Sequence, residues 1–221
     1  MIRIALDGPS GAGKSTLAKD IAKHLGIVYL DTGALYRTVG LWAKMNGADP
    51  HDPVAMEKLL GRLDVKVRLE EGVQQVYLNG EAVGDRIRTP EMSMYASAVS
   101  ALPCVREFLL ETQRSFAREN SVIMDGRDIG TVILPDADVK IYLTASDEVR
   151  ALRRQRELCA KGIDSTLEEV LADMKKRDSA DASRAVAPAV AAKDAVVLDN
   201  SLLDGEQTLQ AALKIIGERS K

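Results

Sequence analysis

A short glycine-rich segment near the amino terminus constrains the fold of this chain more than any other feature. The segment fits the pattern G-x-x-x-x-G-K-[ST] and consists of Gly8, Pro9, Ser10, Gly11, Ala12, Gly13, Lys14 and Ser15. It follows an apolar strand predicted over residues 2–6 and precedes a helix predicted from the helical spacing of Leu17, Ile21 and Leu25. Strand, turn and helix in this order are the context that a phosphate-binding loop requires.

The residue types of this loop suit the triphosphate of a nucleotide. Its glycines let backbone N–H groups converge on phosphate oxygens, and the helix that follows adds the positive end of its dipole. Lys14 is expected to reach the β- and γ-phosphates, and the Ser15 hydroxyl is expected to ligate Mg²⁺. Thr16 continues the predicted nucleotide-binding segment.

Five short apolar strands alternate with helices along the chain. We predict them over residues 2–6, 27–30, 122–124, 139–143 and 196–198. This alternation predicts an α/β fold, a five-stranded parallel sheet flanked by helices. Asp7, Asp31 and Asp125 each come directly after or at the end of a strand, so they are expected at the carboxyl edge, where such folds bind ligands.

Residues 64–84 show a different period. Apolar and polar residues alternate there, and Asn79-Gly80 is a strong hairpin signal. The pattern predicts a small antiparallel β insert. Further along the chain, Ser165 with Glu168 predicts the capping box of a helix, and the Ala- and Ser-rich residues 179–194 predict a loop.

Composition excludes several classes of protein. The net charge of −3 argues against a nucleic-acid partner, and no uncharged apolar run approaches the ~18 residues of a membrane helix. The two cysteines and two histidines are too few for a disulfide scaffold or a multi-histidine metal centre. We therefore expect a cytoplasmic protein that binds neither nucleic acid nor membrane. We also expect a monomer, although composition does not determine the oligomeric state.

The motifs beyond the loop favour a kinase over other nucleotide-binding proteins. The chain lacks Asn-Lys-x-Asp, with which a GTPase reads guanine, and the strand at 122–124 ends in Asp125-Gly126 without a following glutamate to activate water. Phosphoryl transfer needs positive charge on the transferring group, which arginine supplies through its planar fork. Arg37, Arg127, Arg177 and Arg184 are the candidates, whereas Arg150 and Arg156 are expected on solvated helix faces.

Over nearly its whole length the sequence resembles the bacterial cytidylate kinases. The most specific segment is Asp125-Gly126-Arg127-Asp128-Ile129-Gly130-Thr131, and further matches are Asp31-Thr32-Gly33-Ala34-Leu35-Tyr36-Arg37, Ile87-Arg88-Thr89, Val105-Arg106-Glu107 and Arg184-Ala185-Val186-Ala187-Pro188. The resemblance implies a P-loop kinase core with an acceptor-binding β insert and a short helical lid. It implies an enzyme that uses ATP and Mg²⁺ to phosphorylate CMP and dCMP.

The resemblance also implies roles for individual residues. Lys14, Arg127, Arg177 and Arg184 would serve catalysis, and Arg153 and Arg154 would help the loop to bind ATP. The CMP-binding residues would be Thr32, Arg37, Ser97, Arg106, Arg127, Asp128, Arg177, Asp181 and Arg184. The chain would form one kinase unit, 1–221, with its core at 1–62, 85–150 and 186–221, the β part of the insert at 63–84 and the lid at 151–185.

Some alternatives stay open at the level of sequence. The acceptor could be UMP or another small molecule, or the chain could hold ATP without transferring a phosphoryl group. Ser97 could be a plain helix-face serine, and Asp125 could either organise Mg²⁺-bound water or hydrogen-bond the phosphate loop.

Overall fold

The computed structural model describes residues 1–70, 72–160 and 162–219. The chain divides into two compact units: residue 1 with Val28–Val122, and Ile2–Ile27 with Ile123–Lys221. The main sheet has five strands in the order β2-β6-β1-β7-β8, which confirms the predicted five-stranded parallel sheet. The strands are β1 (Arg3–Asp7), β2 (Val28–Asp31), β6 (Val122–Gly126), β7 (Val139–Thr144) and β8 (Val196–Asp199).

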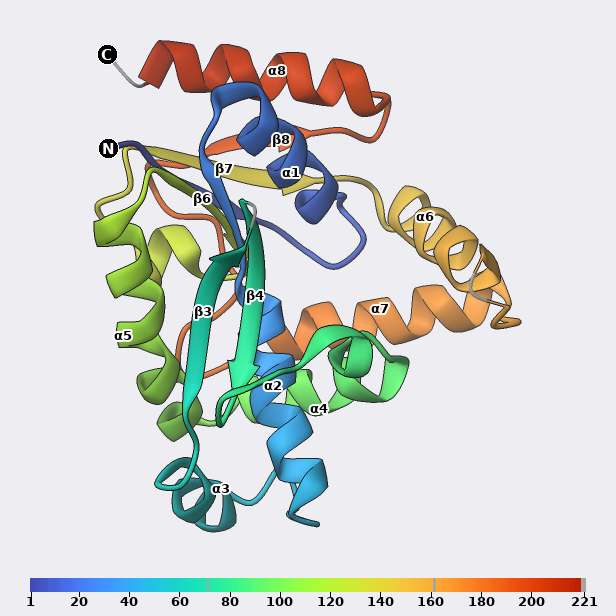
Figure 1. The fold of residues 1–221 in the computed structure, drawn as a ribbon. Coiled ribbons are helices and arrows are strands. Elements are labelled where there is room, and N and C mark those ends of the chain that lie inside the picture. Colours follow the sequence, from blue (N-terminus) through green and yellow to red (C-terminus); the bar gives the residue numbers. More distant parts are fainter. Residues whose placement is uncertain (71, 161, 220–221) are drawn as a thin grey trace. The chain divides into compact units, whose positions relative to one another are not determined.

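The unit that contains the amino-terminal strand is built on β1, β7, β8 and all of β6 except Val122. Its helices are α1 (Lys14–Leu25), α6 (Asp147–Ala160), α7 (Leu167–Ala182), α8 (Gly205–Arg219) and the π-helical turn η2 (Ile129–Ile133). Helices α1 and α8 pack against each other on one side of these strands (Figure 1). Leu6 of β1 and Ile141 and Leu143 of β7 are fully buried, as expected for central strands covered by helices, whereas Val197 of the edge strand β8 is exposed.

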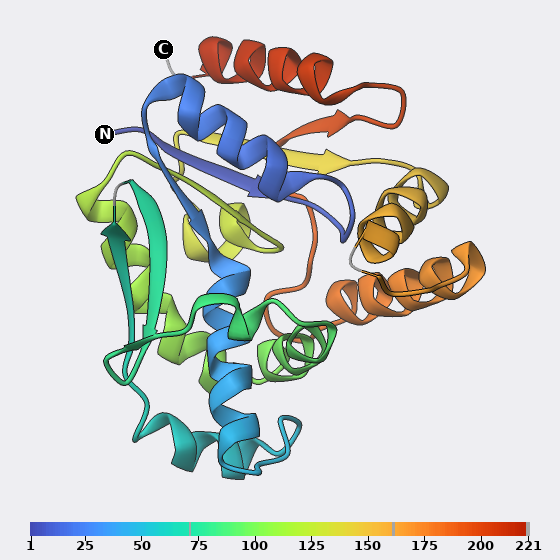
Figure 2. The same ribbon diagram turned by 45° about the vertical axis from the view of Figure 1, so that its right-hand side comes forward.

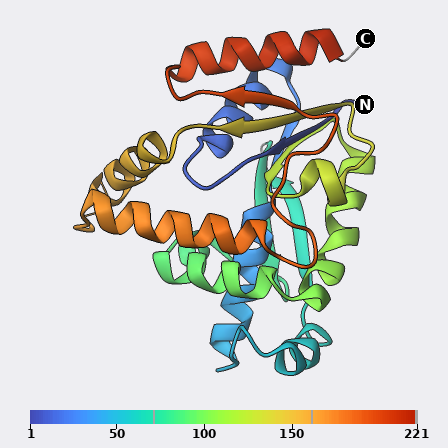
Figure 3. The same ribbon diagram turned by 180° about the vertical axis from the view of Figure 1, so that it is seen from behind.

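Helices α6 and α7 lie side by side at one end of this unit (Figure 3). They enclose a small apolar cluster of Ala151, Val170 and Met174. The predicted loop at 179–194 was wrong in its first residues, because α7 continues to Ala182. The predicted capping box was wrong by one residue. The Thr166 hydroxyl accepts the N–H of Glu169, and the Glu169 carboxylate accepts the N–H of Thr166.

The other unit holds the predicted antiparallel insert. Its elements are α2 (Thr32–Met45), α3 (Pro53–Leu60), β3 (Val65–Glu70), β4 (Val73–Leu78), β5 (Glu81–Ala82), η1 (Gly84–Ile87), α4 (Pro90–Ser100) and α5 (Pro103–Glu119). Figure 2 shows α2 beside α4, with the β3-β4 hairpin close by. Asn79 and Gly80 link β4 to β5 with φ angles of 49° and 88°, as the Asn-Gly signal predicts.

One apolar core joins the hairpin to the helices of this unit. Val65 faces Leu78 across the β3 and β4 ladder, and both are buried in the cluster that includes Leu35, Val39 and Leu109. Within the described residues, no helix is both long enough and apolar enough to span a membrane.

Candidate active site

The glycine-rich loop connects β1 to α1 and has the backbone that its glycines predict. Gly8, Gly11 and Gly13 have φ angles of 148°, 73° and 92°. A Cβ atom at Gly8 would lie 2.0 Å from the carbonyl oxygen of Leu143, so no other residue fits this position without displacing β7. The loop therefore combines left-handed backbone with close packing on the neighbouring strand.

Lys14 is the first residue of α1 and its side chain is buried beneath the loop. Its Nζ donates a hydrogen bond to the carbonyl oxygen of Pro9 at 2.7 Å. Burial, reinforced by the nearby charge of Arg127, lowers the pKa of Lys14 to about 7, while Asp125 and Asp7 oppose this shift. An anionic phosphate beside Lys14 would favour its charged form.

Ser15 and Asp125 offer oxygen ligands next to Lys14. The Ser15 hydroxyl donates to Oδ2 of Asp125 at 2.9 Å, which ties the start of α1 to the end of β6. Oxygen atoms are the ligands that Mg²⁺ prefers, and Mg²⁺ usually takes one or two from the protein beside phosphate and water. Ser15 and Asp125 thus fit a Mg²⁺ site, and the bond between them corresponds to the hydrogen-bonding role considered for Asp125.

Asp7, at the end of β1, anchors the segment that follows β6. Its carboxylate accepts the backbone N–H groups of Ile129 and Gly130, both at 2.8 Å. These residues open the π-helical turn η2, directly after Arg127 and Asp128. Burial raises the pKa of Asp7 to about 6 from 3.8, although both backbone hydrogen bonds act in the opposite direction.

The raised pKa of Asp7 predicts how the free energy of unfolding depends on pH. Because the folded state favours the protonated carboxyl, the folded protein binds more protons than the unfolded chain between pH 3.8 and about 6, and the Asp7 contribution to stability falls as pH rises. Asp7→Asn removes this titration. From pH 5 to 7, the free energy of unfolding of the variant should gain about 1 kcal/mol relative to wild type. Urea unfolding of both proteins at several pH values measures the difference, and a constant difference would contradict the assignment.

Three arginines gather around the buried carboxylate of Asp181 on α7. Nε of Arg127 lies 3.2 Å from one Asp181 oxygen, and Nη2 of Arg184 lies 2.9 Å from the other. Arg177 belongs to the same group, because burial and the charge of Arg127 lower its pKa. Nε of Arg177 is buried and has no hydrogen-bond partner among the described residues. Asp178 also acts on Arg177, and three guanidinium groups beside these two carboxylates leave an excess of positive charge that suits an anion.

Arg153 and Arg154 take different positions on α6. Arg153 reaches the phosphate loop, where Nη1 approaches the carbonyl oxygen of Ala12 at 3.4 Å and the side-chain oxygen of Asn200 at 3.0 Å. Arg154 pairs with the exposed Glu157 at 3.0 Å and interacts electrostatically with Arg177. The structure thus brings Arg153 to the loop, whereas Arg154 lies nearer to the arginine group.

A second set of candidates lies in the other unit, at the start of α2. Asp31 caps this helix by accepting the N–H of Ala34 at 3.0 Å, and its other oxygen accepts Nη2 of Arg37 at 2.6 Å. Thr32, the first helical residue, is buried. Nε of Arg37 is buried without a partner among the residues that the structure describes. Arg37 therefore retains a donor that an anion could take.

Arg106 and Ser97 lie near each other in the same unit. Nη1 of Arg106 donates to the carbonyl oxygen of Ser100 at 2.9 Å, and the Ser100 hydroxyl donates to the carbonyl oxygen of Ser97 at 2.9 Å. The Arg106 guanidinium also lies over the Tyr36 ring, 5.6 Å from its centre. These contacts hold the buried Arg106 between α2 and α4.

The predicted residues thus fall into one group in each unit. Thr32, Arg37, Ser97 and Arg106 belong to the unit with the antiparallel sheet, and the remaining candidates belong to the unit with the phosphate loop. That all the proposed CMP contacts converge stays a prediction, as does the convergence of Asp31 with Asp7 and Asp125.

Four residues of these sites were missed from the sequence. Gln74 bonds the backbone of Asp31, and Asn200 donates to the Ala12 carbonyl oxygen at 3.1 Å. Asp178 accepts the N–H of Ser10, and Arg150 is buried against the same loop residue, so its predicted exposure was wrong. Isolated polar residues outside a recognisable motif give no signal in the sequence, so their roles depend on tertiary packing.

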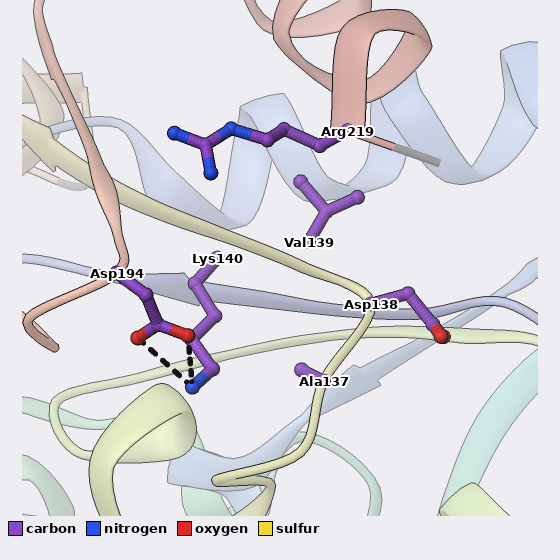
Figure 4. A pocket seen from close by; sticks show the side chains of 6 residues that line it. All are labelled: Ala137, Asp138, Val139, Lys140, Asp194 and Arg219. Carbon is purple, nitrogen blue, oxygen red and sulfur yellow. Dashed lines mark hydrogen bonds and ion pairs between the residues drawn. The ribbon is translucent and has the colours of Figure 1, made fainter. Parts of the chain in front are cut away.

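A small pocket lies elsewhere in the unit with the phosphate loop. It is lined by Ala137, Asp138, Val139, Lys140, Asp194 and Arg219 (Figure 4). Nζ of Lys140 contacts both carboxylate oxygens of Asp194, at 2.8 and 3.0 Å, and the Pro135 carbonyl oxygen at 2.6 Å. The charge of Lys140 is thus already neutralised by Asp194. None of the predicted site residues lines this pocket.

A parallel α/β sheet, a glycine-rich loop before α1 and a buried loop lysine define the P-loop class of nucleotide-binding proteins. The model of the cytidylate kinase family matches residues 4–218, and the chain belongs to this family.

Comparison with known proteins agrees with this membership. The chain is 48% identical to a cytidylate kinase of Caldicellulosiruptor bescii, over 97% of this chain and 95% of the relative. It is 47% identical to a cytidylate kinase of Klebsiella pneumoniae, over 98% and 95% of the two chains. Among solved structures, an uncharacterized protein from Eubacterium ventriosum has a similar fold, with a TM-score of 0.53 at 15% identity and coverage of 99% and 100%.

Proposed function

We propose that this chain transfers the γ-phosphoryl group of ATP to CMP, giving CDP and ADP, and that dCMP is a second acceptor. Membership of the cytidylate kinase family supports the reaction. The observation that carries the proposal is one buried guanidinium nitrogen in each unit, Nε of Arg37 and Nε of Arg177, neither of which has a partner among the described residues. Buried donors of this kind fit phosphate oxygens.

The reaction needs positioning and positive charge more than acid–base chemistry. A phosphate oxygen of CMP attacks the γ-phosphorus in line, and the bond to the bridging oxygen of ADP breaks. Lys14, Arg127, Arg177 and Arg184 would stabilise the charge that spreads over the transferred group. Mg²⁺ held at Ser15 and Asp125 would neutralise further charge on the phosphates. The attacking phosphate is already ionised, so no general base is required.

The acceptor site would divide into three parts. Thr32, Arg37 and Arg127 would bind the CMP phosphate, with Arg184 near the acceptor. Arg177 and Asp181 would contact the sugar. Ser97, Arg106 and Asp128 would read the base, because the cytosine amino group suits a carboxylate, whereas its N3 and O2 accept from a guanidinium.

We further propose that residues 151–185 act as a lid over ATP, including Arg153 and Arg154, and that 63–84 belongs to the acceptor-binding insert. Contact of Arg153 with the carbonyl oxygen of Ala12 supports a place for it beside the triphosphate. A monomer in the cytoplasm, supplied there with ATP, Mg²⁺ and CMP, completes the proposal.

Release of ADP, coupled to an optical readout, tests the proposed reaction across CMP, dCMP, UMP and AMP. We expect CMP and dCMP to be turned over far faster than UMP or AMP. Preferred use of UMP would replace the assigned acceptor by another. ADP release that no acceptor stimulates would make the chain an ATP-binding module instead of a kinase.

Gln74 is expected to hold the arginine that binds the acceptor phosphate. From β4, its Oε1 accepts the Asp31 N–H at 2.6 Å and its Nε2 donates to the Asp31 carbonyl oxygen at 3.2 Å. Asp31 in turn pairs with Arg37. Gln74→Leu should raise the KM for CMP roughly fivefold, since a hydrogen bond contributes about 1 kcal/mol, and leave the KM for ATP within about twofold.

The matched control for this prediction is Gln75→Leu. Gln75 is the next residue of β4, and successive side chains of a strand point to opposite faces of the sheet. The KM for CMP should be unchanged in this control. Equal shifts of both KM values in Gln74→Leu would indicate a general structural effect.

A further inference from the structure

Arg150 is a buried cation that the proposed reaction does not use. Only 6% of its side chain is exposed, although it lies on the arginine-rich helix α6. Its Nε donates to the Ala145 carbonyl oxygen at 3.2 Å, and Nη2 pairs with Asp147. Its Nη1 donates to the carbonyl oxygen of Ser10 at 2.8 Å and also pairs with Asp178. The guanidinium is thus directed at the phosphate loop, with its hydrogen bonds distributed over four partners.

Asp178, on α7, binds the other backbone group of Ser10. One of its oxygens accepts the N–H of Ser10 at 3.2 Å, and the other pairs with Arg150. The backbone N–H and the carbonyl oxygen of Ser10 are therefore both bound, one by Asp178 and the other by Arg150. These partners come from two different helices that pack against each other.

The packing beside Ser10 leaves little freedom for the loop. A Cβ atom on Gly11 would lie 2.8 Å from the Met174 side chain and 3.0 Å from the Arg150 carbonyl oxygen. Helices α6 and α7 thus fit closely against the loop at Gly11, and the polar pair holds it at Ser10. A loop whose N–H groups must point at a phosphate gains from being fixed before the ligand arrives.

We propose that Arg150 and Asp178 are positioning residues that hold the backbone of Ser10 from both sides and so fix the phosphate loop for ATP. Arg150 also offsets the negative charge of Asp178 next to the site of an anionic ligand. Without Arg150, the Asp178 carboxylate would lose its ion pair beside the phosphate loop. This inference rests on the proposed function only in taking ATP as the loop's ligand.

Arg150→Met is expected to raise the Kd for Mg²⁺-ATP at least about tenfold, measured by calorimetry in the absence of CMP. Asp178→Asn removes the charge but keeps an oxygen that can accept the Ser10 N–H, so its effect should be smaller. In the double variant the unpaired carboxylate is absent, so the Kd should return to within about threefold of that of Asp178→Asn. If the two substitutions weakened ATP binding independently, the double variant would bind ATP more weakly than either single variant.

Arg156→Met and Asp173→Asn are the matched controls, since both side chains are exposed on the same two helices. Their Kd for ATP should stay within about twofold of wild type. The proposal is overturned if Arg150→Met shifts the Kd no more than Arg156→Met does, or if the double variant is weaker than both single variants. If Arg150→Met does not fold, Asp178→Asn decides the outcome, and the proposal is overturned if its Kd for ATP shifts no more than that of the Asp173→Asn control.

Direct binding separates this proposal from the proposed reaction. If wild-type protein binds ATP but no acceptor stimulates ADP release, the assignment of CMP fails while the positioning of the loop is still measured. If the protein phosphorylates CMP and Arg150→Met binds ATP normally, the reaction stands and the positioning role fails.

Discussion

Lys14→Ala should lower kcat by roughly 10³- to 10⁵-fold, the range that single charged groups supply at phosphoryl-transfer sites. Lys14 starts α1 with its Nζ directed back under the phosphate loop at Pro9. When substrate binds, its phosphate oxygens would replace the Pro9 carbonyl oxygen as the partner of Nζ, and Lys14 would be fully charged. Because burial already lowers the pKa of Lys14, its replacement by a neutral residue should not weaken the fold.

Initial rates with saturating ATP and CMP measure this effect, with thermal unfolding as a check of the fold. Lys19→Ala, an exposed lysine on the same helix, is the matched control and should keep wild-type turnover. A folded Lys14→Ala variant within tenfold of wild type would remove the basis for assigning catalysis to the loop.

Asp128→Asn should change the choice of base by roughly one to two powers of ten. Asp128 is buried directly before the π-helical turn that Asp7 anchors. A carboxylate accepts from the cytosine amino group, whereas an amide can donate to O4 of uracil. A buried polar group left without a partner costs ~1–3 kcal/mol, so activity with CMP should fall much further than activity with UMP.

The measurement is kcat/KM for both acceptors in wild type and variant. Asp136→Asn makes the same chemical change at a carboxylate whose side chain is 71% exposed, and should leave the ratio unaltered. An unchanged ratio of CMP to UMP in Asp128→Asn would mean that another group reads the base.

The sequence carried the information for the sheet and the loop because both depend on short-range patterns. Buried parallel strands are continuous apolar runs, and the phosphate loop depends on glycines whose spacing is visible without a fold. The turn between β4 and β5 followed in the same way from Asn79-Gly80, whose two left-handed residues the structure reproduces.

The contacts that were missed depend on which helix faces lie against the loop. Arg150 belongs to a helix with several arginines, and its spacing does not distinguish it from the exposed Arg156. Its burial depends on α7, which brings Asp178 to the same loop residue. The end of α7 was misjudged for a related reason. Ala and Ser are compatible with both helix and loop, and the ion pairs of Asp181 with Arg127 and Arg184 fix the last turn.

The contact between Gln74 and Asp31 bears on which sequence changes the insert can tolerate. Gln74 binds main-chain atoms, and every residue other than proline presents the same N–H and carbonyl group at position 31. Point substitutions there leave this contact in place, even where they remove the bond to Arg37. Insertion or deletion of one residue in β4 would instead turn Gln74 to the other face of the sheet. The β3-β4 hairpin should therefore tolerate insertions and deletions less well than position 31 tolerates substitutions.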